Sequence, residues 1–209
     1  MPSDHFVTDA AELRAILGAP SERAANKDRH ALHAMDRRWL AHAPFCLVAT
    51  SDAQGRCAVS PKGDPAGFVH VIADTHLAIP DRPGNKRADG FHHVLENPHV
   101  GLLFVIPGRS DTLRIHGTAR IVRDGDYFDA LVVKGHRPRL ALEVEIETLF
   151  YHCAKAWMRS GLWEHDAWTP GVMPSRAEIV KAIEAPEASL RELEAHYGSA
   201  YAEGLYRGG

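Results

Sequence analysis

The sequence predicts a mainly β protein, an antiparallel barrel with helical additions at both ends of the chain. Six or seven segments have the composition and alternation of strands, and most of them are joined by short polar turns, as in hairpins. Helical spacing of apolar residues occurs before the first strand, after the last strand and once between strands. With 209 residues, 45% of them apolar, the chain is long enough for one domain with a sizeable core.

Residues 1–43 are expected to form a helical extension that acts as a lid. Asp9 can cap a helix that runs to about Leu17. Ser21 can cap a second helix over residues 21–43, because apolar side chains recur there at helical spacing.

Residues 44–168 are expected to form the barrel. Polar turns separate the apolar segments of two successive hairpins, and alternation marks the strands that follow. Pro98 ends a helix that interrupts the strands, and a short helix precedes the last strand. The expected strands and hairpins lie at 45–64, 67–81, 99–108, 112–122 and 141–153, and the expected helices at 86–98 and 125–135.

Residues 169–209 are expected to form a C-terminal helical extension of the same domain. Ser175 precedes one predicted helix, over 175–184. Apolar positions at helical spacing predict a second helix over 186–206. No repeat or long linker divides the chain.

Charge and residue usage exclude several classes of protein. The 24 basic and 27 acidic residues are interspersed and give a net charge of −3, so no basic field is available for nucleic acid or an anionic membrane. No apolar run is long enough to span a membrane, and the N-terminus lacks the pattern of a signal peptide, which indicates a cytoplasmic protein. Three distant cysteines predict neither disulfides nor a zinc site, and the 14 histidines include no pair with an evident third metal ligand.

The stretch IPDRPGNKRADGF, at residues 79–91, is rich in cations for a turn between a strand and a helix. If the helix begins after Asn85, the free N–H groups of its first turn would lie beside Lys86 and Arg87. Such a turn suits a phosphate, and Arg82 could close it from the other side. The alternative is that these cations are solvated loop residues, which is the more common case for an arbitrary loop.

A second unusual segment, CAVSPKGDPAGF, ends a predicted strand. Its residues alternate between two faces, Val59, Pro61 and Gly63 on one and Ser60, Lys62 and Asp64 on the other. Prolines withhold backbone donors, which places the segment at a sheet edge or a barrel rim. It is either an ordinary edge strand or a rim that presents a hydroxyl, backbone amides and a cation to a planar ligand.

These two motifs, together with HLAIPDRPGNKRADGFHHVLENPHVGLLFVIPG and LRIHGTARI, resemble the pyridoxamine 5'-phosphate oxidase-like FMN-binding split-barrel superfamily. Within it they are most similar to a branch with SPKGD and PDRPGN motifs, over about residues 44–168. The resemblance implies an antiparallel split β-barrel that forms a homodimer, with FMN in a groove between the subunits.

The resemblance also implies which residues contact FMN. Its phosphate would be held by Arg82, Asn85, Lys86 and Arg87. The flavin ring would lie beside Val59, Ser60, Pro61, Lys62 and Gly63, and the last strand pair would contribute Thr112, Arg114 and Gly117. A fixed cation near N1 and the C2 carbonyl stabilises the negative charge of the reduced ring and raises its redox potential. Lys62 is expected in this role.

The segment FYHCAKAWMRSGLW, at residues 150–163, is expected in this branch to reach the flavin across the dimer interface. Lys155 and Arg159 would then contact the ligand. The alternative is that its tryptophans fix the terminal helices and the dimer. Cys153, alone, is more typical of a small buried residue than of a redox thiol.

The chain departs from the oxidase itself, whose basic C-terminal motif has no convincing counterpart among Arg159, Arg191 and Arg207. Pyridoxamine phosphate oxidation is therefore not expected. Sequence fingerprints of hydrolases, P-loop enzymes and Rossmann dinucleotide binders are absent. The expected function is that of a flavin-dependent oxidoreductase, which transfers a hydride or electrons between the flavin and a small substrate or electron donor. The alternatives are a nonenzymatic flavin carrier and a haem-binding split barrel.

Overall fold

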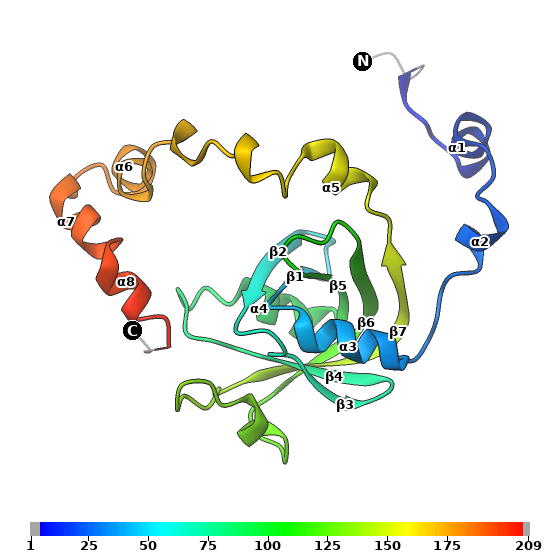
Figure 1. Cartoon of the computed structure of the whole chain (residues 1–209), viewed down its shortest axis with the longest axis horizontal. Coiled ribbons are helices and arrows are strands. Elements are labelled where there is room, and N and C mark those ends of the chain that lie inside the picture. The colour runs from blue at the N-terminus through cyan, green and yellow to red at the C-terminus, as the bar shows by residue number, and fades with distance from the viewer. Residues whose placement is uncertain (1–4, 207–209) are drawn as a thin grey trace.

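Seven strands pair into one antiparallel sheet in the computed structural model, which describes residues 5–206 (Figure 1). The order across the sheet is β2-β1-β5-β6-β7-β4-β3, so β2 and β3 are its edges. The strands are β1 (Phe45–Ser51), β2 (Cys57–Gly63), β3 (His70–Ala73), β4 (His76–Pro80), β5 (His99–Val105), β6 (Thr112–Val122) and β7 (Ala141–His152). The predicted antiparallel β fold, with a strand in every expected segment, is confirmed.

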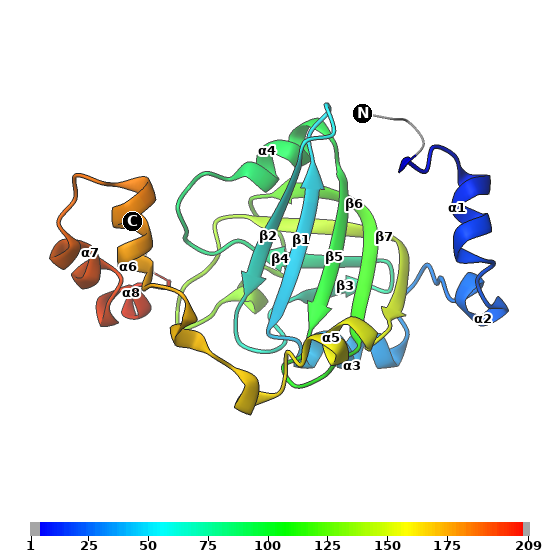
Figure 2. The ribbon, with the colours of Figure 1, turned by 90° about the horizontal axis from the view of Figure 1, so that it is seen from above.

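The two longest strands, β6 and β7, bend this sheet into a split barrel. The first half of β6 pairs with β5, and the first half of β7 pairs with β4. Between these halves the register shifts at His116 and Gly117, which is a β-bulge. A Cβ atom at Gly117 would lie 1.9 Å from the backbone oxygen of Glu145, so only glycine fits. In Figure 2, β3 and β4 run across the direction of β1, β2 and β5.

Alternate side chains of the strands fill the inside of the barrel. Val48, Leu102, Ile115 and Leu149 lie directly opposite one another on β1, β5, β6 and β7, and all four are buried. Burial of apolar surface contributes about 25 cal/mol per Å². Layers of this kind therefore supply most of the stability of the barrel and hold its strand ends in fixed positions.

The N-terminal extension differs from the prediction. Helix α1 (Ala10–Leu17) forms as expected, and the carboxylate of Asp9 caps it. The helix predicted over residues 21–43 is wrong, because the structure has two short helices there, α2 (Glu22–Ala25) and α3 (Ala34–His42). In Figure 2, α1 and α2 stand to one side of the barrel, and neither has a buried residue, so they form no lid over their own chain.

Tertiary pairing explains the break between α2 and α3. The backbone N–H and carbonyl of Arg29 both pair with Leu149 of β7, which holds this segment extended. His33 and Asp36 then form a capping box that starts α3. Leu40 of α3 belongs to the same apolar cluster as the barrel strands. The boundary at residue 44 stays a prediction, although α3 already packs on the barrel.

The C-terminal extension is a chain of short helices that passes around one side of the barrel (Figure 1). The helix predicted over 186–206 is divided into two helices at Gly198, although apolar residues continue at helical spacing beyond it. Helix α5 (Lys155–Ser160) and a 3-10 turn (His165–Ala167) precede the extension. The extension itself contains a 3-10 turn (Pro170–Val172), α6 (Arg176–Ile179), a π-helical turn (Val180–Glu184), α7 (Leu190–His196) and α8 (Ser199–Glu203). The short helix predicted over 125–135 is a 3-10 turn at Phe128–Leu131. Within residues 5–206, no helix has the length and apolar character needed to cross a membrane.

Candidate functional site

A cavity of about 220 Å³ lies where the end of β2 meets the segment that follows β4. We call it the Lys62–Arg82 cavity. The SPKGD and PDRPGN motifs, which are separated by a whole hairpin in the sequence, meet here. The residues that line the cavity are Pro61, Lys62, Gly63, Phe68, Pro80, Arg82, Pro83 and Gly84. The structure thus brings together four of the predicted cofactor contacts, Pro61, Lys62, Gly63 and Arg82.

Two ion pairs cross between these motifs. Lys62 Nζ of the first motif lies 3.0 Å from Asp81 Oδ1 of the second. In the opposite direction, the guanidinium of Arg82 pairs with the carboxylate of Asp64. Only 1% of the Asp64 side chain and 14% of the Arg82 side chain are exposed, so this second pair is buried. Sequence reasoning missed both carboxylates as partners, although each stands inside a motif that it singled out.

Arg82 keeps hydrogen-bonding capacity for a ligand. Its Nε donates to Asp64, and its Nη2 donates to the backbone oxygen of Leu131 at 2.7 Å. Its Nη1 is buried and has no hydrogen-bond partner among the described residues. A buried donor without an acceptor costs about 1–3 kcal/mol, and more when it is charged. Arg82 also lines the Lys62–Arg82 cavity, so the unsatisfied donor belongs to a side chain at this site.

The predicted phosphate turn at a helix start does not form as expected. Helix α4 (Asp89–Glu96) begins after Ala88, later than predicted. The Asn85 side chain accepts a hydrogen bond from the Arg87 N–H at 3.1 Å, so it closes a turn before the helix instead of capping it. Arg87 also pairs with Asp89 at 3.0 Å on the surface. An acidic first residue suits the positive end of the helix dipole, which favours this later start.

The backbone around Arg87 is unusual. Lys86 and Ala88 have φ values of 61° and 55°, in the left-handed region that non-glycine residues seldom adopt. Each such residue costs about 1–3 kcal/mol, and such residues cluster at functional sites. Asn85, Lys86 and Arg87 are not among the residues that line the Lys62–Arg82 cavity. Their predicted contact with the phosphate stays a prediction.

Strand β2 turns its polar side chains inward, in agreement with the predicted alternation. Ser60 and Lys62 are half-buried, whereas 61% of Val59 is exposed. A Cβ atom at Gly90 of α4 would lie 3.7 Å from the Ser60 hydroxyl, and Lys62 Nζ lies 5.3 Å from the centroid of the Phe91 ring. Ser60 therefore lies under α4, and Val59 lies on the outer face of this edge strand.

Two further predicted contacts lie on β6, which β1 and β5 separate from β2. Thr112 is fully buried, and its hydroxyl has no hydrogen-bond partner in the described part of the chain. Arg114 Nε lies 2.7 Å from His116 Nε2, to which it donates, and its guanidinium lies 5.5 Å from the Phe150 ring centroid. Burial and the charge of Arg114 lower the pKa of His116, which keeps its ring neutral and able to accept. Within one chain, Thr112 and Arg114 do not reach the Lys62–Arg82 cavity.

Helix α5 carries the last two predicted contacts, Lys155 and Arg159, which are both exposed. The rings of Trp157 and Trp163 stack with their centroids 5.5 Å apart. Trp163 Nε1 donates to a backbone oxygen in the loop between β5 and β6 at 2.8 Å. These contacts support the packing interpretation of the tryptophans. Figure 2 shows α4 and α5 at opposite ends of the barrel.

Cys46 and Cys153 lie in different surroundings. Cys46 is inside the barrel, where burial raises the pKa of its thiol to about 12. Cys153 was expected to be buried but is exposed, because it follows the last residue of β7. Among residues 5–206, no group of three His, Cys, Asp or Glu side chains could hold a metal ion. Arg207, considered above for a substrate phosphate, lies outside the described residues.

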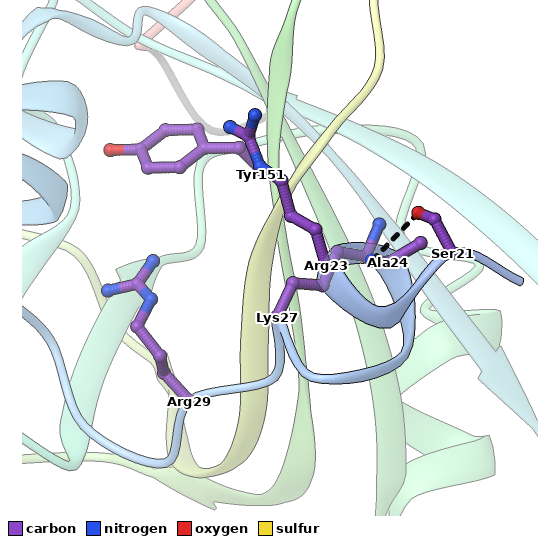
Figure 3. Close-up of a pocket in the computed structure, with 6 residues that line it drawn as sticks. All are labelled: Ser21, Arg23, Ala24, Lys27, Arg29 and Tyr151. Atoms are coloured by element: carbon purple, nitrogen blue, oxygen red, sulfur yellow. Dashed lines mark hydrogen bonds between the residues drawn. The ribbon is translucent and has the colours of Figure 1, made fainter.

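A second cavity, of about 340 Å³, lies between α2 and the end of β7 (Figure 3). We call it the Arg29–Tyr151 cavity. Sequence reasoning missed it, because the predicted helix over 21–43 dispersed its basic residues around a helix surface. The residues that line it are Ser21, Arg23, Ala24, Lys27, Arg29 and Tyr151.

Two cations of the Arg29–Tyr151 cavity have partners within the chain. Both Nη atoms of Arg29 donate to Asp36, one to each carboxylate oxygen, and Asp36 is fully buried. Lys27 Nζ lies 4.0 Å from the centroid of the Phe150 ring. Burial acts to raise the pKa of Asp36, but the hydrogen bonds it accepts outweigh burial and lower that pKa. Burial and the charge of Asp36 raise the pKa of Tyr151 to about 12, so its hydroxyl stays protonated.

The match to a protein family supports this architecture. The family model for pyridoxamine 5'-phosphate oxidase matches residues 32–153, which is more than half of the chain. HupZ of Group A Streptococcus is 19% identical over 57% of this chain and 93% of its own, with a TM-score of 0.47. HutZ, the heme storage protein of Vibrio cholerae, is 17% identical over 57% of this chain and 94% of its own, with a TM-score of 0.39.

A third solved structure comes from Clostridium acetobutylicum. It is a protein related to general stress protein 26 of B. subtilis, from the pyridoxinephosphate oxidase family. It is 15% identical over 56% of this chain and 85% of its own, with a TM-score of 0.41. No curated protein matches the chain.

Proposed function

This chain belongs to the pyridoxamine 5'-phosphate oxidase family, and we propose that it binds FMN with the phosphate in the Lys62–Arg82 cavity. The observation that most supports this is the buried Nη1 of Arg82, which has no acceptor among the described residues. A phosphate ester presents several anionic oxygens, which a guanidinium binds with well-defined geometry. The chemistry of the cavity therefore fits the phosphate end of FMN.

The size of the cavity limits how much of FMN it holds. Its volume of about 220 Å³ is below the roughly 300–1,000 Å³ of pockets that enclose a drug-sized ligand. The phosphate and part of the ribityl chain would occupy it, and the flavin ring would lie outside. Pro61, Lys62 and Gly63, which line the cavity, are the nearest of the predicted ring contacts.

A second copy of the chain would complete the site around the ring. Four predicted contacts, Thr112, Arg114, Lys155 and Arg159, do not line the cavity within one chain. Helix α1 also presents apolar side chains without cover, with Ile16 exposed at 64% and Leu17 at 70%. Such an uncovered apolar surface favours an interaction with another protein surface. We propose that the chain is a homodimer and that the partner supplies part of the ring site.

Bound FMN would supply hydride or electron transfer, and the residues of the chain would position and tune it. Arg82 would hold the phosphate. Lys62 would place a positive charge near the ring, attenuated by its pair with Asp81 at 3.0 Å. The proposed activity is that of a flavin-dependent oxidoreductase that acts on a small molecule.

The test is a titration of the purified chain with FMN, riboflavin and haem, followed by visible absorption and flavin fluorescence. We expect saturable FMN binding that is tighter than riboflavin binding, because only FMN carries the phosphate. Bleaching of bound FMN by NADH or NADPH, and recovery with an electron acceptor, would support an enzyme over a flavin carrier. A Soret band on haem addition without FMN binding would contradict the proposal.

A further inference from the structure

Tyr206, at the end of the described chain, connects the C-terminal segment to the Lys62–Arg82 cavity. This segment follows α8 and ends beside the barrel in Figure 1. The Tyr206 hydroxyl donates a hydrogen bond to Oδ1 of Asp64. The centroid of its ring lies 5.9 Å from the guanidinium carbon of Arg82, and the ring stacks on that of His136 with the centroids also 5.9 Å apart. Tyr206 therefore contacts both members of the buried ion pair.

The two oxygens of Asp64 serve two different donors. Oδ2 accepts from Arg82 Nε, and Oδ1 accepts from the Tyr206 hydroxyl. Because only 1% of the Asp64 side chain is exposed, water has little access to replace the hydroxyl. The hydrogen bond to Asp64 raises the pKa of Tyr206, so the hydroxyl remains a donor at neutral pH. With Oδ1 occupied, Arg82 binds this carboxylate through one oxygen.

The Arg29–Asp36 pair shows the alternative arrangement. There each Nη atom of the guanidinium donates to one carboxylate oxygen, so both nitrogens have an acceptor within the chain. A bidentate pair of this kind is the preferred geometry of arginine with a carboxylate. In the Arg82–Asp64 pair, the Tyr206 hydroxyl holds Oδ1 and the Tyr206 ring lies beside the guanidinium. Without the hydroxyl, the carboxylate and the guanidinium would be less restrained and could rotate into a bidentate pair.

We propose that Tyr206 is a positioning residue for the phosphate site. By holding Oδ1 of Asp64 with its hydroxyl and lying against the guanidinium with its ring, it keeps Arg82 in the single-nitrogen arrangement that leaves Nη1 for a phosphate oxygen. This inference rests on the proposed function, because it assigns the phosphate to the same cavity. It also makes docking of the C-terminal segment and phosphate binding mutually dependent, since a coupling between two sites acts in both directions.

The test compares Tyr206→Phe with the unchanged chain in binding of FMN and riboflavin, measured by quenching of flavin fluorescence. The substitution removes one hydroxyl and keeps the ring, so the fold is retained. We expect FMN affinity to fall about tenfold, the effect of one hydrogen bond to a charged group. Riboflavin affinity should not change. Tyr201→Phe, in α8 just before this segment and at a residue that is 56% exposed, is the matched control and should alter neither affinity.

Limited proteolysis of the C-terminal segment gives a second measurement. FMN should protect this segment more than riboflavin does in the unchanged chain, and this difference should vanish in Tyr206→Phe. If Tyr206→Phe keeps the full preference for FMN over riboflavin, the role of Tyr206 is overturned but the phosphate site is not. Equal binding of FMN and riboflavin by the unchanged chain would instead overturn the phosphate site, and this inference with it.

Discussion

Each of the two cavities is lined by an arginine that is paired with a buried aspartate, but the two arginines are left in different states. In the Arg29–Tyr151 cavity, Arg29 donates through both Nη atoms to a carboxylate that belongs to the chain. In the Lys62–Arg82 cavity, Arg82 gives Asp64 a single nitrogen and retains a buried Nη1 without a partner among the described residues. The larger cavity is therefore held by a completed structural ion pair, whereas the smaller one contains an incomplete set of hydrogen bonds.

This difference separates cations that stabilise the fold from a cation that is available to a ligand. Positive charge alone does not distinguish them, since both cavities are lined by lysine and arginine. The two arginines differ instead in whether their guanidinium nitrogens have acceptors among the described residues. A completed pair costs stability when it is broken, while an incomplete one costs stability until a ligand arrives.

The largest expected effect comes from breaking the completed pair. Arg29→Met would leave the fully buried Asp36 carboxylate without its guanidinium. Removal of one partner from a buried pair costs about 3–5 kcal/mol, so the free energy of unfolding should fall by about that amount in urea denaturation. Arg23→Met, at an exposed position of the same cavity, should change it by less than about 0.5 kcal/mol. Equal effects of the two substitutions would show that Arg29 is not a structural cation.

A smaller effect is expected at the Lys62–Asp81 pair. Lys62→Met removes a partly exposed cation, and Asp81→Asn removes the carboxylate that attenuates it. The interaction of a partly exposed cation with the negative charge of the reduced ring is taken as about 1 kcal/mol, as for an exposed ion pair. The potential of bound FMN should therefore fall by about 20 mV in the first variant. It should rise by a similar amount in the second. Shifts of the same sign in both variants, measured by redox titration, would remove Lys62 from the tuning role.

The smallest expected effect is a pH dependence from His116 and His152. Burial, and then the neighbouring cations, lower the pKa of both groups. A histidine with a lowered pKa in the folded chain binds fewer protons there than in the unfolded chain, whose value is about 6.5. The free energy of unfolding should therefore decrease as the pH falls from about 7 through about 6.5 and below. His116→Gln and His152→Gln should each flatten this slope, and His92→Gln, at an exposed position, should not.

The sequence was sufficient to predict the barrel, because strand alternation and short turns are local signals. All predicted strand segments form strands, and residues of the SPKGD and PDRPGN motifs line one cavity. Predictions failed where a distant contact decided the local structure. The segment from 26 to 33 has helical spacing, yet Arg29 pairs with Leu149 of β7 and holds it extended.

The candidate site shows the same limit. Sequence spacing indicated which cations gather near a turn, but not which of them an acidic neighbour takes. Arg87 is paired with Asp89, and Lys62 with Asp81, whereas Arg82 keeps a nitrogen unsatisfied among the described residues. Tyr206 lies so far along the chain from Asp64 that no local pattern connects them. Hydrogen-bond satisfaction depends on three-dimensional partners, so it required the structure.

The most direct test of the central claim is the ratio of FMN affinity to riboflavin affinity in Arg82→Lys. Lysine keeps a positive charge beside Asp64 but cannot supply the separate donors of a guanidinium. A charge-assisted hydrogen bond contributes about 1.5–3 kcal/mol, so FMN affinity should fall about 10–100-fold while riboflavin affinity stays the same. Arg87→Lys, outside the cavity, should leave the ratio within about twofold. An unchanged ratio in Arg82→Lys would contradict the account.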